Sequence, residues 1–415
     1  MSTTTRRRVC TPPASASTRK TLSVDVLLEI VACSDVTTIV RWAATGKVLR
    51  RAILEPAFHR RLVAAGFQFD PALLFAVSYE SYLKYDSHRR YTLHVVHTRE
   101  PSRRRADEDA ISIHHHRWFK PVAARDVLLL RWCDAFRVSS RVDLHVCNML
   151  TGQVTELPLA TVSDVRQNQY VLLSVGDVGG SFEVLVADDD TRFQIFSSKQ
   201  GRWGVVRQAS VARHRPISSS SLPAIIGRTV YWLVLVNDRQ RYYPGGPGPE
   251  RILALNVDAA EATMMKLPQG CISSLMPYRH NDKHLLLASV RGQLSLLVTE
   301  SLGITMWTLT SRGSASAATW NRQLVIGARE ILRQAELEVG DDLTRVCVDL
   351  EGLGEKSGSL ILFVGSGMPF RLDLGINKEE APILKRLGSV ESLGVKEVFL
   401  HEIDRSSLLQ AMKSF

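Results

Sequence analysis

Residues 22–62 read LSVDVLLEIVACSDVTTIVRWAATGKVLRRAILEPAFHRRL, and their hydrophobic pattern has the period of a helix. Val26, Leu27, Ile30 and Val31 recur at the spacing of one helix face, with acidic residues on the other side. The pattern therefore predicts a short amphipathic helix that can bury one face.

Two further helices are expected in the same stretch. Ser34 and Asp35 can cap a second helix, whose apolar positions begin at Ile39. A third helix is expected over residues 47–53, and Pro56 then ends it, because a residue before proline disfavours helical backbone. Three short helices bury little apolar surface alone. We therefore expect an exposed apolar edge that docks on a partner.

Beyond residue 65 the pattern changes to short runs rich in Val, Leu and Ile, bounded by Gly, Asn, Asp or Ser, which indicates strands. Pairs of runs recur about every 45–55 residues, the spacing of propeller blades. We therefore expect a β-propeller of about six blades, with a β-sandwich as the alternative fold. The expected strands are 127–132, 142–147, 170–175, 182–186, 230–236, 252–257, 285–290, 293–298 and 360–364.

The ends of the β domain are expected to meet, because a closed propeller leaves no sheet edge exposed. Residues 73–78 or 91–97 are the candidates for the strand that pairs with the last blade, and residues 402–415 are expected to form a short amphipathic helix. The expected organisation is a disordered basic tail (1–20), a helical domain (21–64), a connecting segment with a mobile charged insert (65–119), and a β domain with a C-terminal helix (120–415).

Composition narrows the class of protein. The net charge is +10, but residues 1–20 alone hold +5, so the large domain has no basic stripe for nucleic acid. The six cysteines are scattered without a CxxC pair, and no apolar run is long enough to cross a membrane. We expect no nucleic-acid or membrane partner, no metal, no cofactor, and a location in the cytoplasm or nucleus.

Enzymatic sites are not favoured by the residues that could form them. Neighbouring histidines at 114–116 would point to opposite faces of a strand, which disfavours a metal site. Asp188 and the two aspartates after it are most simply a polar hairpin turn. A propeller hydrolase that uses paired carboxylates is the enzymatic alternative.

Both halves of the chain resemble a known family, the grass-type plant F-box proteins with a β-propeller-like associated domain. Leu22, Asp25 and residues 27–30 fit the opening LPxDLLxEI run of the F-box, and Ile53, Pro56 and Phe58 fit its closing run. Ser23 stands where the family usually has proline, and Leu49 where it usually has tryptophan. The associated domain is resembled by AIIGRTVYWLV (224–234), GQLSLLVTESLGITMWTL (292–309), WNRQLVIG (320–327), SGSLILFV (357–364) and LHEIDRSSLLQAM (400–412).

The resemblance implies a non-catalytic substrate receptor of an SCF-type cullin-RING ubiquitin ligase. The F-box would bind an SKP-family adaptor, and through it a cullin, while the β domain binds an unknown target protein. The alternative is a non-ligase propeller scaffold with a decayed F-box, because Ser23 and Leu49 depart from the motif. The implied adaptor-binding residues are Leu22, Val26, Leu27, Ile30, Val40, Leu49, Ile53 and Pro56.

A target-binding loop is expected at residues 237–250, NDRQRYYPGGPGPE, because it joins two strand runs and combines aromatic and basic residues with tight turns. Its candidate contact residues are Arg239, Arg241, Tyr242 and Tyr243.

Overall fold

The structure is a computed structural model of the full chain, and it divides into two compact units, Met1–Ala65 and Gly66–Phe415. No helix among the described residues is long and apolar enough to cross a membrane. The described residues are 22–34, 36–64, 69–82, 91–97, 119–132, 143–148, 153–162, 169–175, 181–188, 191–210, 222–234, 251–271, 282–311, 319–337, 348–365, 368–374, 382–387 and 398–403.

The first unit is helical and contains one helix more than the sequence predicted. Its helices are α1 (Val24–Ala32), α2 (Val36–Thr45), α3 (Lys47–Ile53) and α4 (Pro56–Ala64). Pro56 ends no segment but begins α4, because a proline at the first helical position lacks only an N–H that would be unbonded there anyway. The expectation of three helices was therefore wrong at this residue.

The buried face of α1 matches only part of the face that the sequence suggested, since Val31 is buried and Leu27 is partly buried. Leu28, Val31 and Ala32 are buried, whereas Val26 and Ile30 are exposed. The helix begins after Ser23, whose hydroxyl accepts a hydrogen bond from the Val26 N–H at 3.4 Å.

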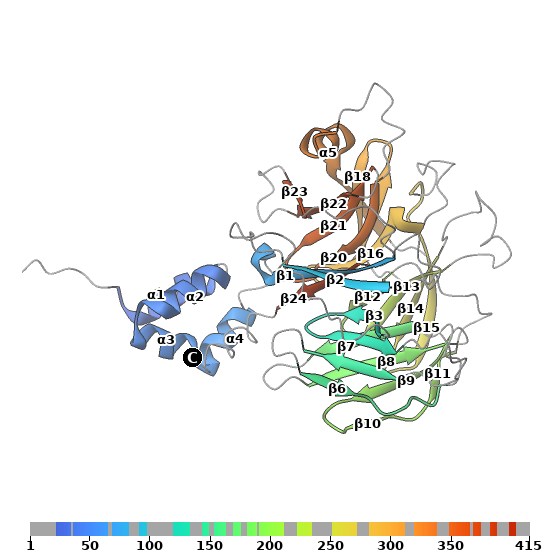
Figure 1. Cartoon of the computed structure of the whole chain (residues 1–415), viewed down its shortest axis with the longest axis horizontal. Coiled ribbons are helices and arrows are strands. Elements are labelled where there is room, and N and C mark those ends of the chain that lie inside the picture. The colour runs from blue at the N-terminus through green and yellow to red at the C-terminus, as the bar shows by residue number, and fades with distance from the viewer. Residues whose placement is uncertain are drawn as a thin grey trace, which may run out of the picture. The chain divides into compact units, whose positions relative to one another are not determined.

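The second unit consists of antiparallel sheets, five of which are each built from strands that follow one another in the chain (Figure 1). Turn residues separate their strands, as the sequence pattern predicts, and all nine expected strands are present. The first two of these sheets comprise β3 (Phe119–Ala124), β4 (Leu128–Trp132), β5 (Leu144–Cys147) and β6 (Val154–Glu156), then β7 (Gln169–Val175), β8 (Phe182–Ala187), β9 (Arg192–Ser197), β10 (Arg202–Trp203) and β11 (Arg207–Gln208).

The other three of these sheets follow in order along the chain. They comprise β12 (Ala224–Ile226), β13 (Thr229–Val234), β14 (Arg251–Asn256) and β15 (Glu261–Lys266), then β16 (Leu285–Val290), β17 (Gln293–Glu300), β18 (Gly303–Ser311) and β19 (Thr319–Gly327), then β20 (Val348–Leu353), β21 (Ser359–Val364), β22 (Met368–Asp373) and β23 (Leu384–Arg386). Short helical segments are η1 (Pro71–Leu73), η3 (Asp282–His284) and α5 (Ala328–Gln334).

The remaining sheet joins the two ends of the β domain. β1 (Leu74–Tyr82) pairs on one side with β2 (Tyr91–His97) and on the other with β24 (Val398–Glu402), with Val77 opposite Leu400. The predicted closure through residues 73–78 is confirmed. β1 and β2 lie within residues 65–119, which were expected to be a connecting segment because two strands alone carry no repeat signal.

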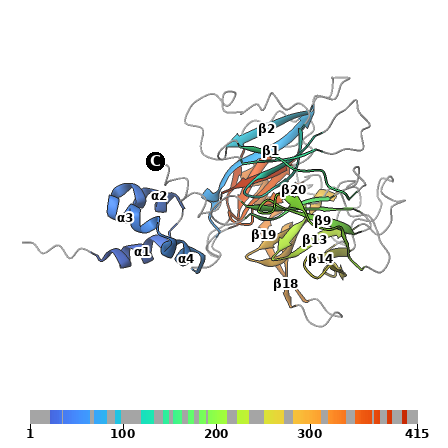
Figure 2. The same ribbon diagram turned by 90° about the horizontal axis from the view of Figure 1, so that it is seen from below.

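Hydrophobic clusters lie between neighbouring sheets, which makes the arrangement propeller-like and not a sandwich of two sheets. Figure 2 shows the ribbons of these sheets from below. One cluster joins the β3–β6 sheet to the β7–β11 sheet, and further clusters join each later sheet to its successor. A last cluster joins β1 and β24 to β21. The first strand of each of the five consecutive sheets lies at the centre, together with β24 of the closing sheet. There β24 contacts β3 and β20, β3 contacts β7, and β16 contacts β12 and β20.

A C-terminal helix was expected from residue 402 to residue 415, but residue 402 belongs to a strand. Glu402 is the last residue of β24, because its strand is paired to β1. Residues 404–415 lie outside the described residues, as do the charged insert at 98–116 and the basic tail.

Candidate functional site

An apolar face on α1 is the first candidate for a binding surface, and we define it as Leu22, Val26 and Ile30. Val26 and Ile30 lie one turn apart on the helix, with 46% and 48% of their surface exposed, and Leu22 precedes the helix with 60% exposed. Three large apolar side chains at a spacing of four residues form an exposed apolar strip. Such a strip is the kind of surface that a partner covers.

The other predicted adaptor-binding residues have different environments. Leu49 and Ile53 are buried between the helices of the first unit, and Leu27 and Val40 are partly buried. Pro56 is exposed at the start of α4. The structure therefore places Leu49 and Ile53 in the core of the helical unit, where their direct role is packing.

The predicted target-binding residues Arg239, Arg241, Tyr242 and Tyr243 lie outside the described residues, in the connection between β13 and β14. The histidines at 114–116 also lie outside the described residues.

Asp188 belongs to the turn between β8 and β9, as the hairpin interpretation predicted. Its carboxylate accepts hydrogen bonds from the Arg192 backbone N–H at 2.9 Å and from the Arg192 Nε at 2.7 Å.

A cavity at the centre of the β domain is the second candidate site. Its volume is ≈ 110 Å³, and it is lined by the first strands of the five consecutive sheets and by β24 of the closing sheet. The lining residues are mainly apolar, and several of them are small, including Ala123, Ala224, Ala288 and Gly352. Small residues on converging strands leave this space because larger side chains would fill it.

One part of the cavity lining is charged. Arg125 lies in the turn between β3 and β4, and it donates to Glu355 Oε2 at 2.9 Å and to the Leu173 carbonyl at 2.7 Å. Glu402, at the end of β24, accepts a hydrogen bond from the Ser357 N–H at 2.7 Å. These contacts bring residues from opposite ends of the β domain to one place.

A second ion pair lies beside the first. Lys356 Nζ forms an ion pair with Asp126. The β3–β4 turn and the β20–β21 turn are therefore connected by two ion pairs, Arg125–Glu355 and Asp126–Lys356. The backbone N–H of Lys356 also donates to Glu402 at 3.2 Å. The β20–β21 turn is therefore held on two sides, by the first of the consecutive sheets and by the closing strand.

Glu355 is electrostatically unusual. Burial raises the pKa of its carboxyl above the ordinary value, and the nearby negative charge of Glu402 adds to the rise. Arg125 and Lys356 act in the opposite direction without cancelling the effect. A carboxyl whose pKa is raised by burial and by a neighbouring charge, and which lies at a cavity, is an indicator of a functional site.

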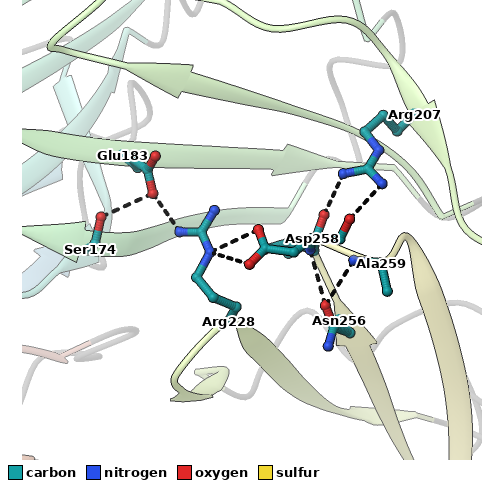
Figure 3. A network of polar contacts seen from close by, with 8 residues as sticks. Ser174, Glu183, Arg207, Arg228, Asn256, Asp258 and Ala259 are labelled. Carbon is teal, nitrogen blue, oxygen red and sulfur yellow. Dashed lines mark hydrogen bonds and ion pairs between the residues drawn. The ribbon is translucent and has the colours of Figure 1, made fainter.

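A third polar network joins the β7–β11 sheet to the β12–β15 sheet (Figure 3). Arg228 lies between Glu183 and Asp258 and is ion-paired to both. Burial lowers the pKa of Arg228, but the hydrogen bonds and charges of the two carboxylates outweigh burial and raise it. Arg207 adds hydrogen bonds to the carbonyls of Val257 and Asp258 at 2.7 and 2.8 Å. The ion pair of Arg228 with Glu183 and the hydrogen bonds of Arg207 cross from one sheet to the other, which indicates a structural role between sheets.

Metal-ligating chemistry is not apparent in the part of the chain that the structure describes, where no group of three His, Cys, Asp or Glu residues converges. The buried Cys271 is a weak nucleophile, since burial raises the pKa of its thiol to about 11 and Glu300 adds to the rise.

Sequence reasoning missed Arg125, Glu355 and Glu402. Arg125 and Glu355 are separated by 230 positions, so no local motif joins them. A weak signal was available in the repeat, because the turns after β3, β12 and β16 each carry an arginine, at positions 125, 228 and 291.

Comparison with known protein families gives one match. Residues 76–415 match the family described as Domain of unknown function (DUF7595), which spans the β domain almost from the start of β1. No curated protein matches the chain.

Proposed function

We propose that this chain, which belongs to the DUF7595 family, is a substrate-receptor subunit of an SCF-type cullin-RING ubiquitin ligase. The helical unit would bind an SKP-family adaptor, and through it a cullin, while the β domain would bind the protein to be ubiquitinated. The chain itself would catalyse nothing and would act by holding the target near a separate enzyme. We expect it to work in the cytoplasm or the nucleus of a plant cell.

The observation that carries the proposal is the apolar α1 face. Leu22, Val26 and Ile30 are exposed in a stretch that resembles the opening run of an F-box. A helical unit with four short helices has a small core, and docking on an adaptor would cover the exposed strip.

The two departures from the F-box motif are compatible with a folded unit. Ser23 caps α1 through its hydroxyl, which proline could not do. Leu49, which stands where F-box proteins usually have a tryptophan, is buried on α3. Neither residue lies on the apolar α1 face, which favours the receptor over a scaffold with a decayed F-box.

The β domain suits target binding because its sheets form a rigid support for loops of variable sequence. We count the closing sheet of β1, β2 and β24 as a sixth blade, since its inner strand contacts the inner strands on both sides. The loop with Arg239, Arg241, Tyr242 and Tyr243 is the proposed target contact.

The test is binding of the full chain to a purified complex of SKP-family adaptor and cullin, scored for a stoichiometric complex. Val26→Asp and Ile30→Asp should each weaken binding by about tenfold or more, because a charge would enter a desolvated apolar contact. The matched control is Leu302→Asp, which changes an equally apolar side chain, 72% exposed, in the β domain.

Unchanged binding by both α1 variants, with folding verified by circular dichroism, would overturn the proposed face. Absence of binding by the unmodified, folded chain would favour the non-ligase scaffold.

A further inference from the structure

The central cavity has two properties that together define a class of ligand. Its walls are apolar over most of their area, and the charged residues that line it within the described part of the chain are Arg125, Glu355 and Glu402. With these three groups ionised, one positive and two negative charges leave a net charge of −1. An unbalanced negative charge in an apolar surrounding of low dielectric attracts a cation.

The positive charge of Arg125 is already committed. Its two terminal nitrogens donate to the Glu355 carboxylate and to the Leu173 carbonyl, at 2.9 and 2.7 Å. An anion entering the cavity would therefore have to displace Glu355 and would meet the carboxylate of Glu402. A neutral ligand would leave the charge imbalance as it is.

We infer that the central cavity binds a small primary ammonium ion with a short apolar chain. The ammonium group lies beside Glu355 and Glu402, where it balances the lining charge. The apolar chain lies against the walls formed by Leu286, Ala288 and Leu400. This inference concerns the β domain alone and does not depend on binding of an adaptor.

The size of the cavity limits the ligand. A dry cavity of about 150 Å³ holds a benzene molecule, so a volume of ≈ 110 Å³ has room for about five non-hydrogen atoms. n-Butylammonium has this size and also reproduces the end of a lysine side chain. A ligand so small is expected to bind with a dissociation constant in the millimolar range.

The raised pKa of Glu355 agrees with the geometry. Burial and the charge of Glu402 disfavour its ionised form, and the opposite charge of a bound cation would favour that form. The Glu355 side chain lines the cavity and keeps 28% of its surface accessible, so that a ligand can reach it.

The experiment measures binding of n-butylammonium chloride to the full chain by calorimetry and by the shift in melting temperature. n-Butanol is the neutral probe of the same shape, butyrate is the anionic probe, and sodium chloride matches the ionic strength. We expect a saturable rise in melting temperature with the ammonium ion and a clearly smaller one with the other probes. An equal response to n-butanol would overturn the inference, as would no response to the ammonium ion.

Two variants localise the site. Glu355→Gln keeps the side-chain shape and should weaken ammonium binding by about tenfold, because it removes the charge. Gly352→Ala would place a methyl group 2.6 Å from Leu400 Cδ1 and 3.7 Å from Leu222 Cδ1, both in the cavity wall, and should also weaken binding.

The matched control is Gly204→Ala, whose methyl group would lie at an ordinary 3.5 Å from the Ile195 carbonyl, outside the cavity lining. It should bind the ammonium ion as the unmodified chain does. Unchanged binding by both Glu355→Gln and Gly352→Ala would place the ammonium ion elsewhere and overturn the inference.

A last experiment distinguishes two sources of the ammonium group, a lysine side chain and a free amine. A lysine blocked at both its amino and its carboxyl group should bind if the natural ligand is a lysine side chain of another protein. Binding of n-butylammonium without binding of blocked lysine would identify a free amine as the ligand.

Discussion

Ser78 Oγ lies 2.7 Å from His401 Nε2, and this hydrogen bond joins strands that are 323 positions apart in the sequence. Ser78 is on β1 and His401 is on β24, and both side chains are buried. The ring of sheets is therefore closed by a buried polar contact in addition to the backbone ladder between these strands.

The closure contact should contribute measurably to stability. Ser78→Ala removes the hydroxyl and leaves a buried imidazole nitrogen without this partner, so we expect a loss of about 1–3 kcal/mol in the free energy of unfolding. The measurement is denaturant unfolding of the β domain in the full chain. Thr310→Ala is the control, because the Thr310 hydroxyl donates to the Thr319 carbonyl at an exposed site, and its loss should cost less. Equal losses would contradict a special role for the closure contact.

Gly358 allows Phe69 to pack against the β20–β21 turn. Its φ is +66°, and an added Cβ would lie 2.4 Å from Phe69 Cγ. Gly358→Ala combines backbone strain with overpacking, and we expect it to destabilise the β domain by about 2–5 kcal/mol. Gly365→Ala is the matched control, because its φ is +65° but its nearest neighbour is 3.7 Å away, so strain alone should cost about 1–2 kcal/mol. The comparison of the two unfolding curves isolates the steric contribution, and equal losses would exclude it.

Arg228 is ion-paired to Glu183 of the neighbouring β7–β11 sheet and to Asp258 of its own β12–β15 sheet (Figure 3). Arg228→Met keeps most of the apolar stem and removes the charge. Because these groups are partly exposed to solvent, we expect a loss of only about 1 kcal/mol at low salt, which shrinks as sodium chloride is added. Arg333→Met is the control, since Arg333 pairs with Glu330 within the same helix and should have a smaller effect. A loss that does not depend on salt would indicate that packing, not charge, is responsible.

Glu355 should make the stability of the β domain depend on pH. Its pKa is raised in the folded state by burial and by Glu402, against the opposing charges of Arg125 and Lys356. The stabilising contribution of the protonated form is therefore fully present below the ordinary pKa of a glutamate and is lost as the pH rises through the raised value. Asp126, which is paired with Lys356, is the remaining charged group of the cluster.

Glu355→Gln removes this titration. The variant should gain stability relative to the unmodified chain as the pH rises from acidic to neutral, and the difference should level off above the raised pKa. Thermal melts of both proteins across this range measure the difference. A difference that falls with rising pH would contradict the direction of the shift.

Local patterns in the sequence predicted the elements well. The nine expected strands are present, and residues 47–53 form α3 as the helical spacing indicated. Pro56 was misread because a proline can follow the end of one helix or occupy the first position of the next, and spacing alone does not distinguish these roles. Glu402 was misplaced in a helix because the apolar spacing after it resembles a helix, whereas its pairing partner lies on β1.

The sequence by itself determined where helices and strands form and that the ends of the β domain would meet, since these follow from hydrophobic period and from the need to cover sheet edges. Only the tertiary structure decided that Val26 and Ile30 face outward while Leu49 and Ile53 are buried, because burial depends on how the helices pack. It also brought Glu355, Arg125 and Glu402 to one cavity. Side chains that are hundreds of positions apart become neighbours only when the ring of sheets closes, and no local pattern encodes that distance.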